Sequence, residues 1–219
     1  MTSNPSSSLR LIVFGGSGRT GRLIVDNALS DGHTVTVAAR DPAAIAAANP
    51  LPAAARVIAT DVRDAASVVR AMQGHDAGIL AVSTPARKPD SLYSSAARNI
   101  VEGAAKTELS RLVAISSGGV RQDDPALPFW YRKFLIPFVM KDLYDDMGEM
   151  EAAIRASALD WTIVRASYLR DEPARSSYRA MDGATPRGGW KLARADLARF
   201  TTDQLRDGRW SRRTPTLAE

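Results

Sequence analysis

The sequence predicts an α/β fold, a single domain in which helices cover both faces of a doubly wound parallel sheet. Strand-like and helix-like segments alternate along the 219-residue chain, which is typical of such sheets. Several strand-like segments are apolar at consecutive positions, and this pattern indicates that both of their faces are buried. The length is that of one domain, and the sequence contains no repeat or interdomain linker.

The predicted strands are short runs of β-branched and aliphatic residues bounded by turn-forming residues. The first strand covers residues 9–14 and ends at glycines, and the second covers 34–39 and is closed by Arg40-Asp-Pro. The other strands are expected at residues 56–59, 77–82, 111–115 and 161–164.

The segments between the strands have helical character. Pro42 suits the first turn of a helix because its φ is fixed near the helical value and no donor is needed there. Helices are expected at residues 19–29, 42–48, 65–72, 91–106, 143–156 and 196–205.

The remaining segments complete the domain organisation. Residues 1–8 are rich in serine and are expected to be a flexible N-terminus, which leaves 9–219 as the folded domain. Ligands in open α/β sheets lie outside the carboxyl ends of the strands. The irregular segments 116–138 and 166–192 follow strands, so we expect them to cover a substrate.

Composition excludes several classes of protein. Hydrophobic residues make up 45% of the chain and charged residues 24%, which excludes a disordered chain. The apolar run at 11–14 is far shorter than the roughly 20 residues that cross a bilayer, and residues 1–8 do not resemble a signal peptide. Cysteine is absent, which excludes disulfides and thiolate chemistry and favours a reducing cytoplasm. We therefore expect a cytoplasmic protein without a membrane partner.

The charged residues indicate an anionic small-molecule ligand rather than nucleic acid. The net charge is +5, which favours anions such as phosphorylated cofactors, but the arginines are scattered along the chain. The local concentration near the C-terminus is interpreted as a solvated tail and consists of Arg206, Arg209, Arg212 and Arg213.

No metal site is expected from the acidic residues or the histidines. Asp145, Asp146 and Glu149 cluster on one predicted helix, but no histidine lies nearby in the sequence. This cluster is interpreted as a solvated helix face. His33 and His75 precede strands and are expected at the surface.

The turn after the first strand carries glycines at the spacing G-x-x-G-x-x-G. Gly15 permits a sharp exit from the strand, Gly18 lets the backbone approach a pyrophosphate, and Gly21 lets the helix pack close to the sheet. The anion would be bound by free N–H groups at the helix N-terminus. The predicted dinucleotide site also includes the residues between these glycines, Ser17, Arg19 and Thr20.

The end of the second strand discriminates between cofactors. NAD sites place an acidic residue here for the ribose hydroxyl, whereas this chain has Arg40. Arg40 and Arg19 together would bind a 2′-phosphate through charge-assisted hydrogen bonds, so NADP(H) is predicted; the alternative makes Arg40 a surface residue beside Asp41. Asp61 and Val62 follow the third strand and suit an adenine ring, although Asp61 is also a candidate helix cap.

Further along the chain, Ala81, Val82 and Ser83 follow the fourth strand and are expected to run along the cofactor. Ser116, after the fifth strand, is placed to hydrogen-bond a carbonyl or the nicotinamide amide; the alternative is a loop serine that bonds its own backbone.

Several motifs together resemble the atypical short-chain dehydrogenase/reductases, over about residues 9–207. The closer resemblance is to the single-domain NAD(P)H-binding group with NmrA-like proteins and biliverdin-IXβ and flavin reductases, which implies a Rossmann-type fold. The motifs are Val13-Phe-Gly-Gly-Ser-Gly-Arg-Thr-Gly-Arg, Ala39-Arg-Asp-Pro, Thr60-Asp-Val-Arg-Asp, Ala114-Ile-Ser-Ser-Gly-Gly, Asp160-Trp-Thr-Ile-Val-Arg and Leu192-Ala-Arg-Ala-Asp-Leu-Ala.

Typical members of the wider superfamily carry a Tyr-x-x-x-Lys pair on the helix after the fifth strand; this chain departs from that pattern, in agreement with the atypical groups, several of which lack the pair. The matching positions hold Leu143 and Met147, which cannot do acid–base chemistry. Tyr144 is one position out of register, about 100° around the helix. Ser116, Tyr144 and Tyr168 remain as candidate catalytic residues, with a packing role the alternative for Tyr168.

We therefore expect an NADPH-dependent reductase of a small conjugated or hydrophobic substrate, acting as a monomer or homodimer. The apolar segment 128–138 is compatible with a lid over such a substrate, or with a subunit interface or core. Two other functions stay open: an NmrA-like NADP-binding sensor, and a cofactor-binding enzyme with an isomerase or cyclase outcome.

Overall fold

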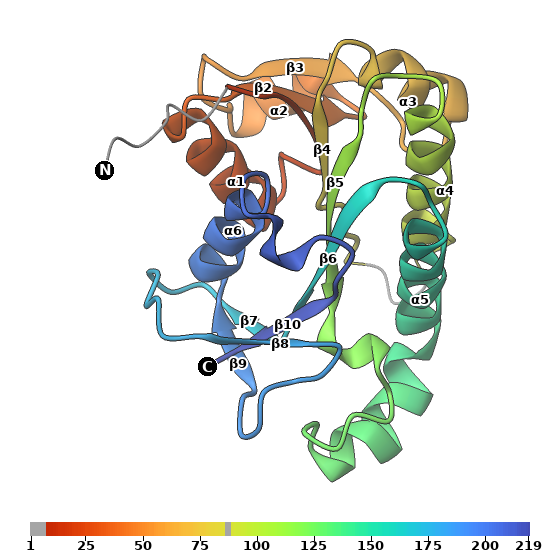
Figure 1. The fold of residues 1–219 in the computed structure, drawn as a ribbon, viewed down its shortest axis with the longest axis vertical. Helices are drawn as coiled ribbons and strands as arrows, with labels where there is room; N and C mark the ends of the chain where they lie inside the picture. Colours follow the sequence, from red (N-terminus) through yellow and green to blue (C-terminus); the bar gives the residue numbers. More distant parts are fainter. Residues whose placement is uncertain (1–7, 86–88) are drawn as a thin grey trace.

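The chain forms one domain around an eight-stranded sheet (Figure 1). A computed structural model describes residues 8–85 and 89–219. The strand order is β3-β2-β1-β4-β5-β6-β10-β8, and only β8 is antiparallel to its neighbour. The strands are β1 (Arg10–Phe14), β2 (Thr34–Ala39), β3 (Arg56–Ala59), β4 (Ala77–Leu80), β5 (Arg111–Ser117), β6 (Asp160–Ala166), β8 (Arg179–Asp182) and β10 (Pro215–Ala218). This confirms the predicted doubly wound parallel sheet.

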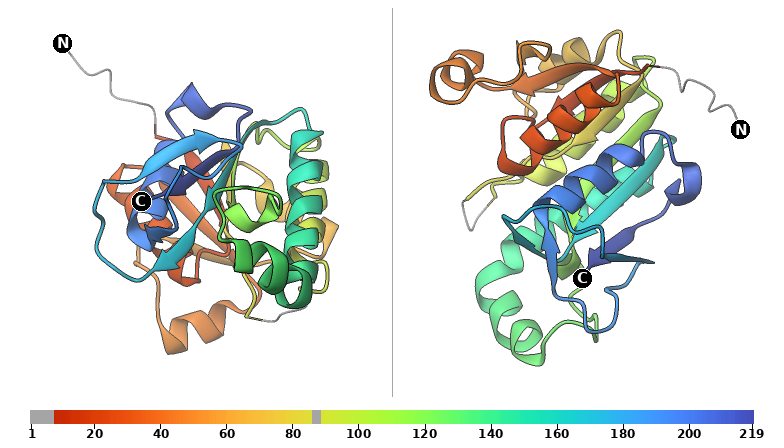
Figure 2. Two further views of the ribbon diagram at one scale, coloured as in Figure 1. Left: turned by 90° about the horizontal axis from the view of Figure 1, so that it is seen from below. Right: turned by 90° about the vertical axis from the view of Figure 1, so that its left-hand side faces the viewer.

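Helices cover both faces of the sheet because its central strands are apolar on both sides. In β1, Leu11 and Val13 pack against the helices of one face, and Ile12 and Phe14 pack against those of the other. Figures 1 and 2 show α1 and α6 together on one face and α3, α4 and α5 on the opposite face. The helices are α1 (Arg19–Ser30), α2 (Pro42–Ala48), α3 (Ala65–Met72), α4 (Leu92–Ala104), α5 (Lys141–Arg155) and α6 (Arg194–Asp203).

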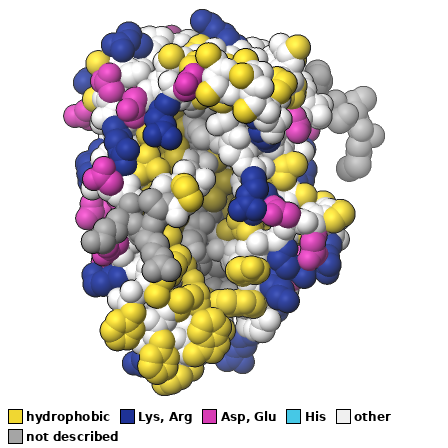
Figure 3. Space-filling model, turned by 180° about the vertical axis from the view of Figure 1, so that it is seen from behind, with side chains coloured by type: hydrophobic (Ala, Val, Ile, Leu, Met, Phe, Trp, Pro, Cys, Tyr) yellow, Lys and Arg dark blue, Asp and Glu magenta, His cyan; other side chains and the backbone are white. Residues whose placement is uncertain are grey.

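The segments expected to be irregular are partly ordered. Segment 166–192 contains β8 and also β7 (Tyr168–Arg170), which pairs with β9 (Lys191–Ala193) in a separate two-stranded sheet. Segment 116–138 leads into a π-helix, Tyr131–Met140, that runs on into α5. Hydrophobic side chains gather on the molecular surface at this end of the molecule (Figure 3).

The C-terminal region is not the solvated tail that was expected. The four arginines are exposed, but β10 follows them and inserts between β6 and β8 with Leu217 fully buried. The Arg213 guanidinium pairs with Asp182 of β8 at 3.2 Å. The strand β10 was not predicted because its burial depends on its pairing with β6 and β8 elsewhere in the chain.

Three polar residues expected at the surface are instead buried or half-buried. His33 is 4% exposed and its Nδ1 accepts a hydrogen bond from the Leu9 N–H, while His75 bonds the Thr36 hydroxyl at 2.9 Å. Asp146 accepts hydrogen bonds from the N–H groups of Tyr93 and Ser94 in the first turn of α4. Its carboxylate therefore caps a neighbouring helix, where the free N–H groups and the helix dipole favour a negative charge.

No helix in the described part of the chain is long and apolar enough to span a membrane. The expectation of a flexible N-terminus concerns residues that lie outside the described range except for Ser8, whose hydroxyl donates to the Gly32 carbonyl at 2.7 Å.

Candidate functional site

The glycine turn between β1 and α1 needs each of its spaced glycines for a different reason. Gly15 has φ +86°, and a Cβ there would lie 2.5 Å from the Ala81 carbonyl oxygen. A Cβ on Gly21 would lie 2.1 Å from the Gly15 carbonyl oxygen. At Gly18 the nearest atom to a Cβ is 3.4 Å away, and this residue lines the cavities described below. Gly15 and Gly21 thus permit the turn itself, whereas Gly18 leaves space above it.

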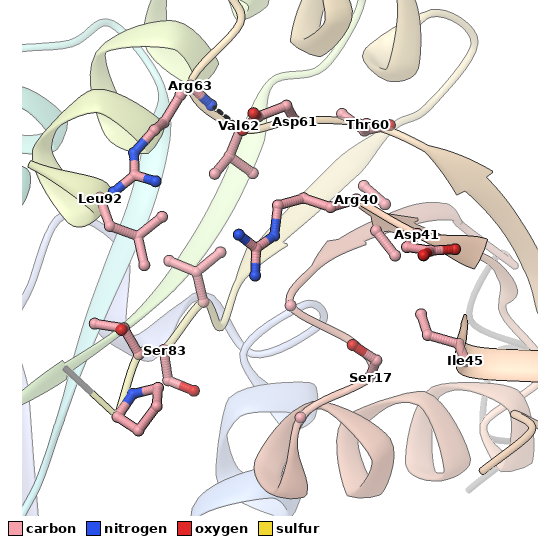
Figure 4. Close-up of a pocket in the computed structure, with 17 residues that line it drawn as sticks. Ser17, Arg40, Asp41, Ile45, Thr60, Asp61, Val62, Arg63, Ser83 and Leu92 are labelled. Atoms are coloured by element: carbon pink, nitrogen blue, oxygen red, sulfur yellow. Dashed lines mark hydrogen bonds between the residues drawn. The ribbon is translucent and has the colours of Figure 1, made fainter. Parts of the chain in front are cut away.

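A cavity of about 520 Å³, the first cavity, opens between this turn and the ends of β2 and β3. Figure 4 shows the Arg40 guanidinium projecting into it, with Ser17 on one side and Asp61 and Val62 on the other. Within the described chain, no carboxylate lies within 4 Å of the Arg40 guanidinium nitrogens. Asp41, beside it, accepts from the Ala44 N–H and caps α2.

The end of β3 places polar groups at the edge of the same cavity. The Asp61 carboxylate accepts a hydrogen bond from the Arg63 N–H at 2.9 Å, and the helix cap in this region is Asp64 instead. The second carboxylate oxygen of Asp61 has no hydrogen-bond partner among the described residues. Thr60 also lines the cavity, and its hydroxyl is buried without a hydrogen-bond partner among the described residues.

A second cavity of about 420 Å³ adjoins the first and shares Gly18, Val82 and Ser83 with it. The two together follow the carboxyl ends of the central strands, the position at which open α/β sheets bind ligands. The residues that line only the second cavity include Arg19, Thr20, Gly21, Ala81, Tyr93, Ile115, Ser116, Ser117, Met147 and Arg194.

The structure separates the two arginines that were expected to bind one phosphate. Arg19 lines the second cavity and Arg40 the first. The Arg19 guanidinium pairs with Asp171 at 2.7 Å, and Asp171 also pairs with Arg194 at 2.6 Å. Arg19 is the first residue of α1, and no sequence pattern indicates that its side chain pairs with Asp171.

Arg194 is a basic residue of the site that sequence reasoning missed. It begins α6, its side chain is 11% exposed, and it donates to the Thr20 hydroxyl at 3.0 Å. This contact joins the N-terminal turns of α1 and α6 across 174 positions of sequence. The motif Leu192-Ala-Arg-Ala-Asp is visible in the sequence, but the position of its arginine depends on the packing of α6 against α1.

Ser116 lies at the second cavity but its hydroxyl is already committed to a neighbouring helix. It donates to the Glu151 carboxylate of α5 at 2.6 Å, and the Arg165 guanidinium of β6 donates to the same carboxylate at 2.6 and 2.9 Å. Burial raises the pKa of Glu151, but the hydrogen bonds and charge of Arg165, with smaller effects from Ser116 and Arg155, outweigh it and leave the pKa lowered. A carboxylate accepts but does not donate, so Ser116 offers lone pairs rather than a proton to the cavity.

Neither candidate tyrosine lines the cavities. Tyr144 is 5% exposed, and its hydroxyl is hydrogen-bonded to the hydroxyl of Tyr131 in the π-helix. Tyr168 is 61% exposed on β7, where its neighbours Ser167 and Leu169 line the second cavity instead. The strand alternation at β7 turns the Tyr168 side chain outward.

The position expected for the lysine of the Tyr-x-x-x-Lys pair does face the second cavity. Met147 lines it, while Leu143 packs between the sheet-facing core and the cluster around Tyr144. Tyr93 of α4 also lines the cavity; burial raises the pKa of its hydroxyl, which is bonded to the Thr84 backbone. Among the described residues that line the second cavity there is no lysine to lower the pKa of a catalytic tyrosine.

The sheet order, the glycine turn and the adjoining cavities above it define a dinucleotide-binding domain of the Rossmann type. The chain belongs to the NAD(P)H-binding family, whose model matches residues 15–208.

Solved structures share this fold over nearly the whole chain. A short-chain dehydrogenase/reductase from Veillonella parvula, in complex with NADP, is 16% identical with a TM-score of 0.78, covering 97% of this chain and 95% of that one. An oxidoreductase from Lactococcus lactis is 16% identical with a TM-score of 0.81, covering 96% and 91%. A Rossmann-fold NAD(P)-binding family protein from Shigella flexneri is 22% identical with a TM-score of 0.72, covering 96% and 94%.

Proposed function

We propose that the protein is an NADPH-dependent reductase of a conjugated or hydrophobic organic substrate. The observation that carries the proposal is Arg40, which projects into the first cavity at the end of β2 and has no carboxylate within 4 Å in the described chain. A 2′-phosphate would supply the missing anion, and hydrogen bonds to a charged group are worth roughly 1.5–3 kcal/mol. An NAD-specific site would instead place an acidic residue here.

The remaining residues fit the rest of a dinucleotide. Asp61 and Val62 offer an acceptor and a flat apolar surface for an adenine ring. Gly18 leaves room for a pyrophosphate at the N-terminus of α1, and Arg194 adds a cation beside Thr20. In this arrangement the diphosphate region is lined by Ser17, Arg19, Thr20 and Gly21. The path toward the nicotinamide is lined by Ala81, Val82, Ser83 and Ser116.

The second cavity favours substrates that need no protein acid. NADPH supplies a hydride to an electrophilic carbon when bound. The Ser116 hydroxyl donates its hydrogen bond to Glu151. The Tyr93 hydroxyl is hydrogen-bonded to the Thr84 backbone, and Tyr144 lies outside the cavity. General acid catalysis is typically worth about 10²- to 10⁴-fold, so a site in which neither Ser116 nor Tyr144 supplies a proton favours acceptors whose conjugation stabilises the charge left after hydride transfer.

The test is the rate of NADPH oxidation with a panel of quinones, flavins, activated enones and simple ketones. We expect turnover with one or more conjugated acceptors and rates lower by about 10² or more for ketones of similar size. Faster turnover of simple ketones would contradict the proposed chemistry.

A second candidate function, an NmrA-like NADP-binding sensor, is favoured by one observation. The positions of the expected Tyr-x-x-x-Lys pair hold Leu143 and Met147, and Met147 faces the second cavity. Tight NADPH binding with no oxidation by any acceptor in the panel would support the sensor over the reductase.

A further inference from the structure

The surface of the segment before α5 carries exposed aromatic side chains. Phe129, Trp130, Phe134 and Phe138 are 64%, 55%, 62% and 80% exposed. We call these residues the aromatic face. Figure 3 shows the hydrophobic side chains gathered at this end of the molecule, with basic side chains near them. Contiguous exposed apolar patches mark interaction sites in soluble proteins.

The inner side of the same segment is firmly packed, so the exposure is not a sign of a loose chain. Ile136 is 1% exposed and forms a buried cluster with Leu127 and Tyr144. Trp190 makes edge contacts with Tyr131 at 5.1 Å and with Trp130 at 6.5 Å between ring centroids. The segment is therefore amphipathic, fixed on one side and apolar on its outward side.

The charges of the segment have one sign. Residues 126–140 contain Arg132 and Lys133 but no aspartate or glutamate. Within the described ranges, no carboxylate oxygen lies within 4 Å of either cation, whereas Lys141 pairs with Asp145. Lys133 is exposed, whereas Arg132 is half-buried with its Nε out of contact with solvent. Exposed aromatic side chains beside an exposed basic residue suit the interface of an anionic bilayer, where the rings enter the headgroup region and the cation meets the lipid phosphates.

A second copy of the chain fits this face less well. A two-fold dimer brings the same patch of both subunits together, so the positive charges of Arg132 and Lys133 from both copies would be gathered in one interface. The face has no carboxylate of its own to compensate them. An anionic lipid surface offers negative charge to the basic side chains of the segment and an apolar layer to its aromatic side chains.

We propose that the aromatic face docks on the surface of an anionic lipid bilayer. Phe134 and Phe138 insert below the headgroups while Lys133 contacts the lipid phosphates. The docking needs no bound dinucleotide, so it stands or fails independently of the proposed reductase function. It replaces the expectation, drawn from the lack of a long apolar run, that the protein has no membrane partner.

The test is co-sedimentation of the full chain with vesicles of phosphatidylcholine alone or mixed with phosphatidylglycerol. We expect binding to the anionic vesicles, weaker binding in high salt, and little binding to the neutral ones. The variant with Phe134→Ser and Phe138→Ser should bind at least about tenfold less, since the apolar anchors are lost. Both side chains are mostly exposed, so the fold should be unaffected.

The matched control changes exposed apolar side chains elsewhere, Tyr168→Ser and Met181→Ser, which are 61% and 41% exposed in the wild type. This control should bind as the wild type does. Absence of wild-type binding, equal binding to neutral and anionic vesicles, or equal binding by the Phe134/Phe138 variant would overturn the proposal. Light scattering that shows a wild-type dimer and a monomeric Phe134/Phe138 variant would assign the face to a second copy instead.

Discussion

Replacing Gly18 by valine should weaken dinucleotide binding strongly and leave the fold intact. The backbone of Gly18 is extended, with φ −73° and ψ 168°, a conformation that β-branched residues adopt readily. A Cβ there meets the Gly15 carbonyl at 3.4 Å and the Ser83 hydroxyl at 4.0 Å, both ordinary separations. The side chain would therefore project into the space that both cavities share.

The expected magnitudes follow from this geometry. Valine is a poorer helix N-cap than glycine, so unfolding should become easier by roughly 0.5–1 kcal/mol. A hydrogen bond to a charged group is worth roughly 1.5–3 kcal/mol, so blocking one N–H contact to a pyrophosphate should weaken binding roughly 10- to 150-fold. NADPH and NADH should be affected alike, because both carry the pyrophosphate.

The assay combines calorimetric titration with thermal unfolding. Gly208→Val is the matched control, because a Cβ at Gly208 meets nothing within 4 Å and Gly208 is exposed far from either cavity. Gly21→Ala is the opposite control and should fold poorly, since its Cβ would lie 2.1 Å from the Gly15 carbonyl oxygen. A folded Gly18→Val protein with unchanged dinucleotide affinity would refute the reasoning.

Three further predictions concern the second cavity and its supports. Arg194→Met should weaken NADPH and NADH binding by the same factor in calorimetry; a loss confined to NADPH would contradict its place beside the pyrophosphate. Tyr144→Phe should change turnover little, since the Tyr144 hydroxyl lies outside the cavities, and a hundredfold or larger fall would give it the acid's role. Glu151→Gln should lower the free energy of unfolding by roughly 3 kcal/mol, because Arg165 loses its buried partner. The folded-state pKa of Glu151 is below its ordinary value of 4.5, so the ion pair stabilises the folded protein above about that pH. In chemical denaturation, the stability difference between the wild type and Glu151→Gln should therefore shrink as the pH falls below it. A difference that stays constant from pH 7 to pH 3 would contradict this.

The parallel part of the sheet was predictable because its signals are local. Consecutive apolar residues in β1 and the glycine spacing after it fix both the strand and the turn to α1. Arg40 was also accessible to sequence reasoning, since it directly follows β2 and the end of that strand lies beside the glycine turn.

What could not be predicted depends on contacts between distant segments. β10 is four residues long and is defined by pairing with β6 and β8. The Glu151 network joins α5, β5 and β6, and no spacing in the sequence indicates that these side chains meet. Asp146 looked like a solvated residue because its capping role depends on the first turn of α4, more than fifty positions away.

The central claim is that Arg40 binds the 2′-phosphate of NADPH in the first cavity. The most direct test is calorimetric titration of the wild type and Arg40→Asp with NADPH and NADH. The wild type should bind NADPH more tightly by about tenfold or more, and Arg40→Asp should lose that preference while its NADH affinity changes little, because one charge-assisted contact is replaced by repulsion. Equal wild-type affinities for the two cofactors, or an Arg40→Asp protein that still prefers NADPH, would contradict the account.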